Sequence, residues 1–105
     1  MNGISTHILD TTIGRPAGGV MVQLFFEGRE LGASVTNEDG RIQALLPLGV
    51  PLSAGVYKIV FAVGSRWPDG FYPEVSVAFS VKDLGSHYHV PLLISPYGFT
   101  TYRGS

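Results

Sequence analysis

The sequence predicts an all-β sandwich of seven or eight short strands, folded as one domain over residues 1–105. Three observations lead to this prediction. Hydrophobic and polar residues alternate along many short stretches, which is the pattern of strands that bury one face. No stretch longer than about ten residues keeps the period of a helix. Fourteen glycines and seven prolines are spread along the chain without a fixed spacing, as expected for turns between short strands.

The expected strands follow one another with turns between them. The first covers residues 4–9, where Ile4 and Ile8 share one face and His7 lies on the other. Strands 20–26 and 31–36 come next and are joined by a hairpin connection at 27–30. A tight turn then ends at Gly40, and Arg41 follows it directly. The remaining strands are expected over residues 56–63, 74–81, 87–94 and 98–103.

Two prolines modify this pattern. Pro91 falls inside the strand at 87–94 and cannot donate a backbone hydrogen bond, so it predicts a sheet edge or a bulge. Pro68 and two glycines leave no helix interior in residues 64–70, which predicts a loop. We interpret Trp67 in this loop as a packing residue and Arg66 as solvated.

The composition excludes several classes of function. A net charge of −1 offers no basic surface for nucleic acid. The chain has no cysteine, which excludes disulfides, thiolate chemistry and sulfur-ligated metals. No apolar stretch approaches the roughly 20 residues of a membrane helix. The N-terminal residues lack the pattern of a secretory signal, so a cytoplasmic location is expected. Only 14% of the residues are charged and 45% are hydrophobic, and this surplus predicts burial in a subunit interface.

The three histidines are the first candidates for chemistry, because all of them fall in otherwise apolar strands. His87 and His89 are expected to point to the same side of their strand, and Tyr88 to the other. Two hypotheses stay open from the residues alone. The pair and His7 could hold a zinc ion with one free position for water. Alternatively, two imidazoles could move protons without a metal while an arginine stabilises the negative charge. A serine nucleophile is not expected, because no Gly-x-Ser-x-Gly motif is present.

Four motifs then occur in order along the chain: STHILD at 5–10, TNEDGR at 36–41, HYHVPLL at 87–93 and TYRGS at 101–105. Together they resemble the 5-hydroxyisourate hydrolases of the transthyretin family over nearly the whole chain. The TYRGS motif is the most specific of the four, since it separates these hydrolases from transthyretin, the hormone carrier. The resemblance implies a transthyretin-like (prealbumin-like) sandwich. The segment at 64–72 is shorter than usual, so the helix on the flank of the sandwich is expected to be shortened or absent.

The resemblance also implies an activity. Enzymes of this kind hydrolyse the N1–C6 amide bond of 5-hydroxyisourate to give 2-oxo-4-hydroxy-4-carboxy-5-ureidoimidazoline during urate (purine) degradation, with no metal or organic cofactor. The catalytic residues map onto His7, Arg41, His89 and Ser105, and the substrate-binding residues onto His7, Arg41 and Tyr102. Family members are homotetramers with active sites where two dimers meet, which agrees with the apolar surplus.

Each of these residues has an expected role. His7 and His89 position and deprotonate the attacking water and return a proton to the leaving nitrogen, and the assignment of base and acid stays open. The Arg41 guanidinium holds the anionic ring and stabilises the oxyanion. Tyr102 stacks on the substrate or bonds to it, and Ser105 offers its hydroxyl or the terminal carboxylate.

Neighbouring residues are given structural roles, and two other functions remain as alternatives. His87 is interpreted as a neighbour at the rim, Arg103 as a partner in an ion pair or an interface hydrogen bond, and Phe71 and Tyr72 as packing residues. The chain could instead be a binding protein that holds a small apolar ligand between subunits, or a structural sandwich module. The intact histidine, arginine and TYRGS positions favour the enzyme.

Overall fold

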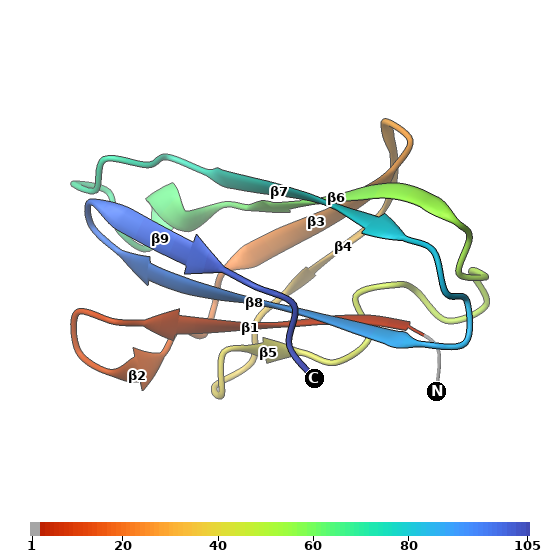
Figure 1. Cartoon of the computed structure of the whole chain (residues 1–105). Helices are drawn as coiled ribbons and strands as arrows, with labels where there is room; N and C mark the ends of the chain where they lie inside the picture. The colour runs from red at the N-terminus through yellow and green to blue at the C-terminus, as the bar shows by residue number, and fades with distance from the viewer. Residues whose placement is uncertain (1–2) are drawn as a thin grey trace.

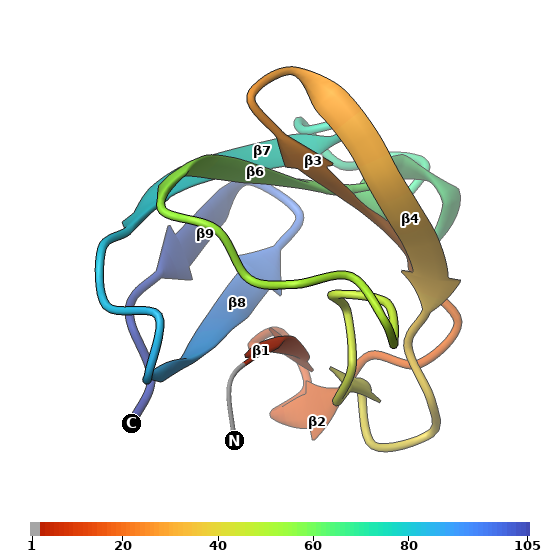
Figure 2. The same ribbon diagram turned by 90° about the vertical axis from the view of Figure 1, so that its right-hand side faces the viewer.

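Two sheets face each other in the computed structural model, which describes residues 3–105 (Figure 1). The first sheet has the order β2-β1-β8-β9, with β5 also paired to β1; its strands are β1 (Gly3–Asp10), β2 (Arg15–Pro16), β5 (Arg41–Ile42), β8 (His87–Ser95) and β9 (Gly98–Thr101). The second has the order β4-β3-β6-β7; its strands are β3 (Met21–Phe26), β4 (Arg29–Val35), β6 (Gly55–Phe61) and β7 (Val75–Val81). Figure 2 shows the two layers from the side. The predicted all-β sandwich is confirmed.

All seven predicted strands are present, with ends that differ by a few residues. The two-residue strands β2 and β5 were not predicted, because two residues carry no alternation that a sequence pattern could detect. Both strands pair with β1 in an antiparallel manner. Strand β5 matters most for the site, since it places Arg41 beside β1.

The prediction of a sheet edge or a bulge at Pro91 is wrong. Strand β8 lies between β1 and β9, so Pro91 is on an interior strand. The antiparallel ladder with β9 ends at the Leu92–Thr101 pair and resumes as one bridge between His89 and Gly104. Pro91 falls in this gap, where no ladder donor is needed, and its carbonyl accepts a hydrogen bond from Thr101 Oγ1 at 2.8 Å.

Strands β1 and β8 come from opposite ends of the chain and pair in parallel over the whole of β1. The register runs from Gly3 opposite His87 to Asp10 opposite Ile94. Since paired residues of neighbouring strands share a face, this ladder fixes which β1 side chains lie beside the histidines of β8.

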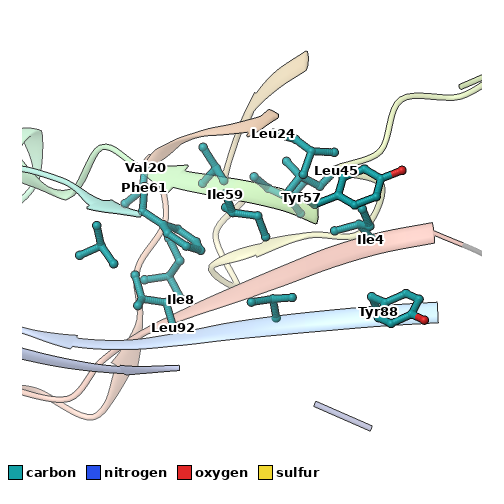
Figure 3. Packing of buried hydrophobic residues seen from close by; sticks show 14 of the residues in the cluster. Ile4, Ile8, Val20, Leu24, Leu45, Tyr57, Ile59, Phe61, Tyr88 and Leu92 are labelled. Atoms are coloured by element: carbon teal, nitrogen blue, oxygen red, sulfur yellow. The ribbon is translucent and has the colours of Figure 1, made fainter. Parts of the chain in front are cut away.

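The hydrophobic core lies between the two sheets (Figure 3). Ile4 and Ile8 of β1 and Leu92 of β8 are fully buried there, opposite Ile59 and Phe61 of β6. Full burial of each such side chain stabilises the fold by about 1.5–3 kcal/mol. The same strands that carry the histidines are therefore anchored on their inner face.

The flank of the sandwich carries only a three-residue 3₁₀ helix, η1 (Val63–Ser65), which confirms the expected shortening. Trp67, just after it, is half-buried, and its Nε1 donates to Asp10 Oδ2 at 3.2 Å. The loop is thus tied to the end of β1. Arg66 is exposed, with its guanidinium 5.4 Å from the Trp67 ring centroid. Within residues 3–105 no helix has the length and apolar character to cross a membrane.

Candidate active site

Polar side chains gather on the outer face of the β1–β8 ladder, opposite the core. The parallel register places Ser5 of β1 beside His89 of β8. The antiparallel register with β5 places His7 beside Arg41. His87 lies two residues before His89 and shares its face, as predicted, while Tyr88 between them is buried in the core. Three segments far apart in the sequence therefore supply one cluster.

A tight turn delivers Arg41 to this cluster. The Asn37 side chain accepts hydrogen bonds at its Oδ1 from the backbone N–H of Asp39 at 2.9 Å and of Arg41 at 3.0 Å. Gly40 has a φ of 71°, and a Cβ there would collide with the carbonyl oxygen of Ile8. Only glycine fits at this position. The turn can therefore press against β1 and start β5 at Arg41.

His89 is held on two sides. Ser5 Oγ lies 2.8 Å from His89 Nδ1 and also 2.8 Å from His87 Nε2. On the other side, the backbone N–H of Gly104 donates to the His89 carbonyl at 2.8 Å. A Cβ at Gly104 would lie 2.6 Å from His89 Cδ2, so the glycine backbone lies directly against the imidazole. This contact brings the end of the chain to the histidine.

A pocket of about 390 Å³ opens at this cluster. Its volume falls within the range of roughly 300–1,000 Å³ that is typical of small-molecule sites. The lining residues come from β1, β5, β8, the segment after β5 and the end of the chain: Ser5, Thr6, Arg41, Ile42, Gln43, His87, His89 and Ser105. Three predicted site residues, Arg41, His89 and Ser105, thus lie together. His7 is half-buried beside Arg41 but is not part of the lining.

Burial and a neighbouring cation lower the basicity of two histidines. The pKa of His7 lies below its ordinary value of 6.5 because of burial and, second, the Arg41 guanidinium; the backbone carbonyl and carboxylate of Asp39 act in the opposite direction. The pKa of His89 is lowered by burial, then by Arg41, His7 and His87. Both shifts favour the neutral imidazole, which is the form able to accept a proton.

Tyr102 and Arg103 line a second hollow, of about 240 Å³, between β7 and the end of the chain. Tyr102 is 56% exposed and does not line the pocket with His89. The Arg103 guanidinium lies 4.5 Å from the ring centroid of Tyr88, a cation–π contact that gives it a structural role. In the single chain, therefore, Tyr102 does not lie in the pocket where it is predicted to contact the substrate.

The geometry gives no support to the zinc hypothesis. Within the described range 3–105, no group of three or more His, Cys, Asp or Glu side chains is arranged to hold a metal ion. The ring nitrogens of His87 and His89 that face each other are both bonded to Ser5 Oγ, which occupies the space between them.

Two members of the cluster, Ser5 and His87, are not among the predicted site residues. The sequence gives Ser5 no function and predicts His87 as a neighbour at the rim. The alternation along β1 did contain the signal, since Ser5 and His7 are two residues apart. What it lacked was the β1–β8 register that puts Ser5 between the two histidines.

Comparisons with known proteins agree with this architecture. The model of the HIUase/Transthyretin family matches residues 4–104. The chain is 45% identical to 5-hydroxyisourate hydrolase 2 of Rhizobium meliloti (strain 1021), over 97% of this chain and 95% of the relative. That alignment spans 114 positions against the 105 residues of this chain, so the relative contains residues that are missing here.

Two solved structures share the fold. The 5-hydroxyisourate hydrolase of Klebsiella pneumoniae is similar with a TM-score of 0.87 and 40% identity, covering 97% of this chain and 98% of that one. Transthyretin from Sparus aurata is similar with a TM-score of 0.87 and 29% identity, covering 99% of this chain and 97% of that one. The chain belongs to the HIUase/Transthyretin family.

Proposed function

We propose that this chain is a hydrolase that opens the six-membered ring of 5-hydroxyisourate at its N1–C6 amide bond, in urate degradation. The observation that carries the proposal is the meeting of Arg41, His89 and Ser105 in one pocket, with His7 paired to Arg41. Relatives named 5-hydroxyisourate hydrolase, which align over almost the whole chain, support the same substrate. The product is 2-oxo-4-hydroxy-4-carboxy-5-ureidoimidazoline.

The reaction proceeds by attack of water on the cyclic amide. A neutral imidazole of the His7 and His89 pair takes a proton from water as the oxygen bonds to C6. The N1–C6 bond then breaks, and the protonated imidazole returns the proton to N1. No net proton is gained or lost by the enzyme. The lowered pKa of both histidines keeps them in the form that this cycle requires.

Arg41 stabilises the negative charge of the substrate and of the tetrahedral intermediate. Its guanidinium presents several N–H donors in a fixed plane, which suits paired oxygen or nitrogen acceptors of a flat ring. Ser105 lines the same pocket and offers its hydroxyl or the terminal carboxylate to the substrate. Tyr102 is the remaining predicted substrate contact, and its ring is exposed in the single chain.

The working form is a homotetramer with active sites where two dimers meet, and its expected location is the cytoplasm. Many large apolar side chains of the single chain are exposed, including Ile13, Met21, Val35, Leu48, Val56, Phe71, Leu84, Tyr97 and Phe99. Surface of this kind is stabilised by contact with other subunits. Light scattering after size exclusion should give the mass of four chains, and a monomer would contradict the assembly.

The activity is tested by producing 5-hydroxyisourate in situ from urate with urate oxidase. The ultraviolet decay of the intermediate is followed with and without the protein, in the presence and absence of EDTA. We expect faster decay with the protein and no effect of EDTA. Decay at the spontaneous rate would refute the enzyme and favour the binding-protein alternative. Sensitivity to EDTA would instead favour the zinc mechanism.

A further inference from the structure

Ser5 Oγ forms a bridge between two imidazoles on the pocket wall. It lies 2.8 Å from Nδ1 of His89 and 2.8 Å from Nε2 of His87. The serine is only 8% exposed, His89 is half-buried and His87 is exposed. All three residues line the pocket, and His87 is the most exposed of them.

The bridge couples the protonation of the two rings. A serine hydroxyl has a single proton to donate, and each neutral imidazole has one donor and one acceptor nitrogen. When the hydroxyl donates to one ring, it accepts from the other. The tautomer of His87 therefore determines that of His89, and with it whether His89 Nε2 carries a lone pair or a proton.

The backbone makes this arrangement rigid. The parallel register sets Ser5 directly opposite His89, and Gly3 opposite His87. Gly104 lies against the other side of the His89 ring, where no side chain would fit. Within residues 3–105, the other ring nitrogens, Nε2 of His89 and Nδ1 of His87, make no hydrogen bond. His89 Nε2 is therefore free to contact the reactants, and His87 Nδ1 is free to contact water.

We propose that Ser5 and His87 form a proton relay behind His89, as positioning residues that move positive charge from the half-buried His89 to the exposed His87. This inference rests on the proposed function. When His89 Nε2 takes a proton from the attacking water, its Nδ1–H proton passes to Ser5 Oγ, and the Oγ proton passes to Nε2 of His87. The positive charge then resides on the exposed His87 instead of the half-buried His89. The reverse transfers return the proton to the leaving nitrogen through His89 Nε2.

The first test is kinetic. We expect Ser5→Ala to lower kcat by about 10- to 100-fold, the size of effect seen for partners that orient a histidine at metal sites. KM should stay within about twofold, since the proposed substrate-binding residues His7, Arg41 and Tyr102 are unchanged. Ser5→Thr, which keeps the hydroxyl, should recover most of the activity. Ser95→Ala is the matched control, since Ser95 is also on the first sheet but its hydroxyl donates to the Gly98 carbonyl, far along β8 from the histidines.

His87→Gln separates proton transfer from simple support. The amide can still bond to Ser5 Oγ but cannot accept a proton. A relay therefore predicts a loss of kcat comparable with that of Ser5→Ala, and no further loss in the double variant. Full activity of His87→Gln, or of Ser5→Ala, would overturn the relay.

A second measurement does not depend on turnover. Imidazole ¹⁵N shifts of the free full-length protein report the tautomers of His87 and His89. We expect one tautomer of each ring in the wild type, and a mixture at both rings in Ser5→Ala. Unchanged shifts in that variant would refute the coupling even if the protein proves inactive on 5-hydroxyisourate. If the wild-type protein is inactive but its His87 and His89 ¹⁵N shifts change together in Ser5→Ala, only the proposed function is refuted.

Discussion

The two faces of the β1–β8 ladder carry side chains of opposite chemistry on the same backbone. On the inner face, Ile4 and Ile8 are fully buried against the second sheet. On the outer face, Ser5 is hydrogen-bonded to both histidines of β8 and His7 is paired with Arg41. Each buried isoleucine is the direct neighbour of an outer-face residue, Ile4 of Ser5 and Ile8 of His7, because successive side chains of a strand point to opposite faces.

This contrast explains how strands alone can hold a polar cluster in place. The buried side chains of the inner face stabilise the sheet. The hydrogen bonds between β1 and β8 then fix where the side chains of the outer face lie. Groups on rigid strands are positioned more precisely than groups on loops. Substitutions on the inner face should therefore change stability, whereas substitutions on the outer face should change turnover.

The largest expected effect is that of His89→Asn on the outer face. Loss of the imidazole removes a proton acceptor and donor, so kcat should fall by about 10²- to 10⁴-fold. Stability and assembly should be unchanged, as measured by thermal denaturation and size exclusion. Collapse of the assembly would mean that His89 acts mainly as a structural residue.

Ile8→Ala tests the inner face. Removing a fully buried isoleucine side chain leaves a cavity, and this should lower the free energy of unfolding by about 2–5 kcal/mol. Denaturant unfolding at fixed protein concentration measures the loss. Leu9→Ala is the matched control, because Leu9 is on the other face and only half-buried, and it should cost less. A large loss of kcat in correctly folded Ile8→Ala would show that the two faces are not independent.

Gly104→Ala should have a smaller effect, confined to the outer face. The added Cβ would lie 2.6 Å from His89 Cδ2, so either the ring or the end of the chain must move. We expect a loss of kcat of about tenfold, because a misplaced catalytic group is costly even when the shift is small. The thermal midpoint should change little, since Gly104 is outside the core. Wild-type kcat would mean that the last residues adjust freely.

Much of this contrast could be predicted from the sequence. Alternation in 4–9 and 87–94 correctly separates the buried residues from His7, and it places His87 and His89 on one face. The tight turn before Arg41 could also be predicted, from the need for a positive φ at Gly40. These features depend only on neighbouring residues.

The pairing of distant segments could not be predicted in the same way. Nothing in the sequence fixes the parallel register between the first and penultimate strands, so the bridge from Ser5 to two histidines remained hidden. The two residues of β5 show no period, yet they hold Arg41 beside His7. A sheet edge or a bulge is wrongly predicted at Pro91, because the position of β8 between β1 and β9 depends on the pairing of strands far apart in the sequence. Each of these outcomes is set by long-range packing, which local patterns do not encode.

The smallest expected effect concerns charge on the outer face. Arg41 is the second cause, after burial, of the lowered pKa of His7 and of His89. In Arg41→Gln the pKa values of His7 and His89 should therefore both rise. The other charged and titratable groups that act on the two rings, Asp39 and His87, stay in place. An NMR titration of the imidazole Cε1 protons measures the shift, with Arg66→Gln on the flank loop as the control.

The same charges determine how stability depends on pH. Because the pKa of each histidine is lower in the folded protein than in the unfolded chain, the unfolded chain binds more protons in the interval between the two values. The free energy of unfolding therefore rises as the pH increases through this interval up to about 6.5, and it falls when the pH is lowered through the same interval. Arg41→Gln narrows the interval, so the loss of stability in acid should be smaller than in the wild type. Suppose that Arg41→Gln changes neither the dependence of stability on acid pH nor the two pKa values. The Arg41 guanidinium of β5 would then not interact with the imidazoles of His7 and His89.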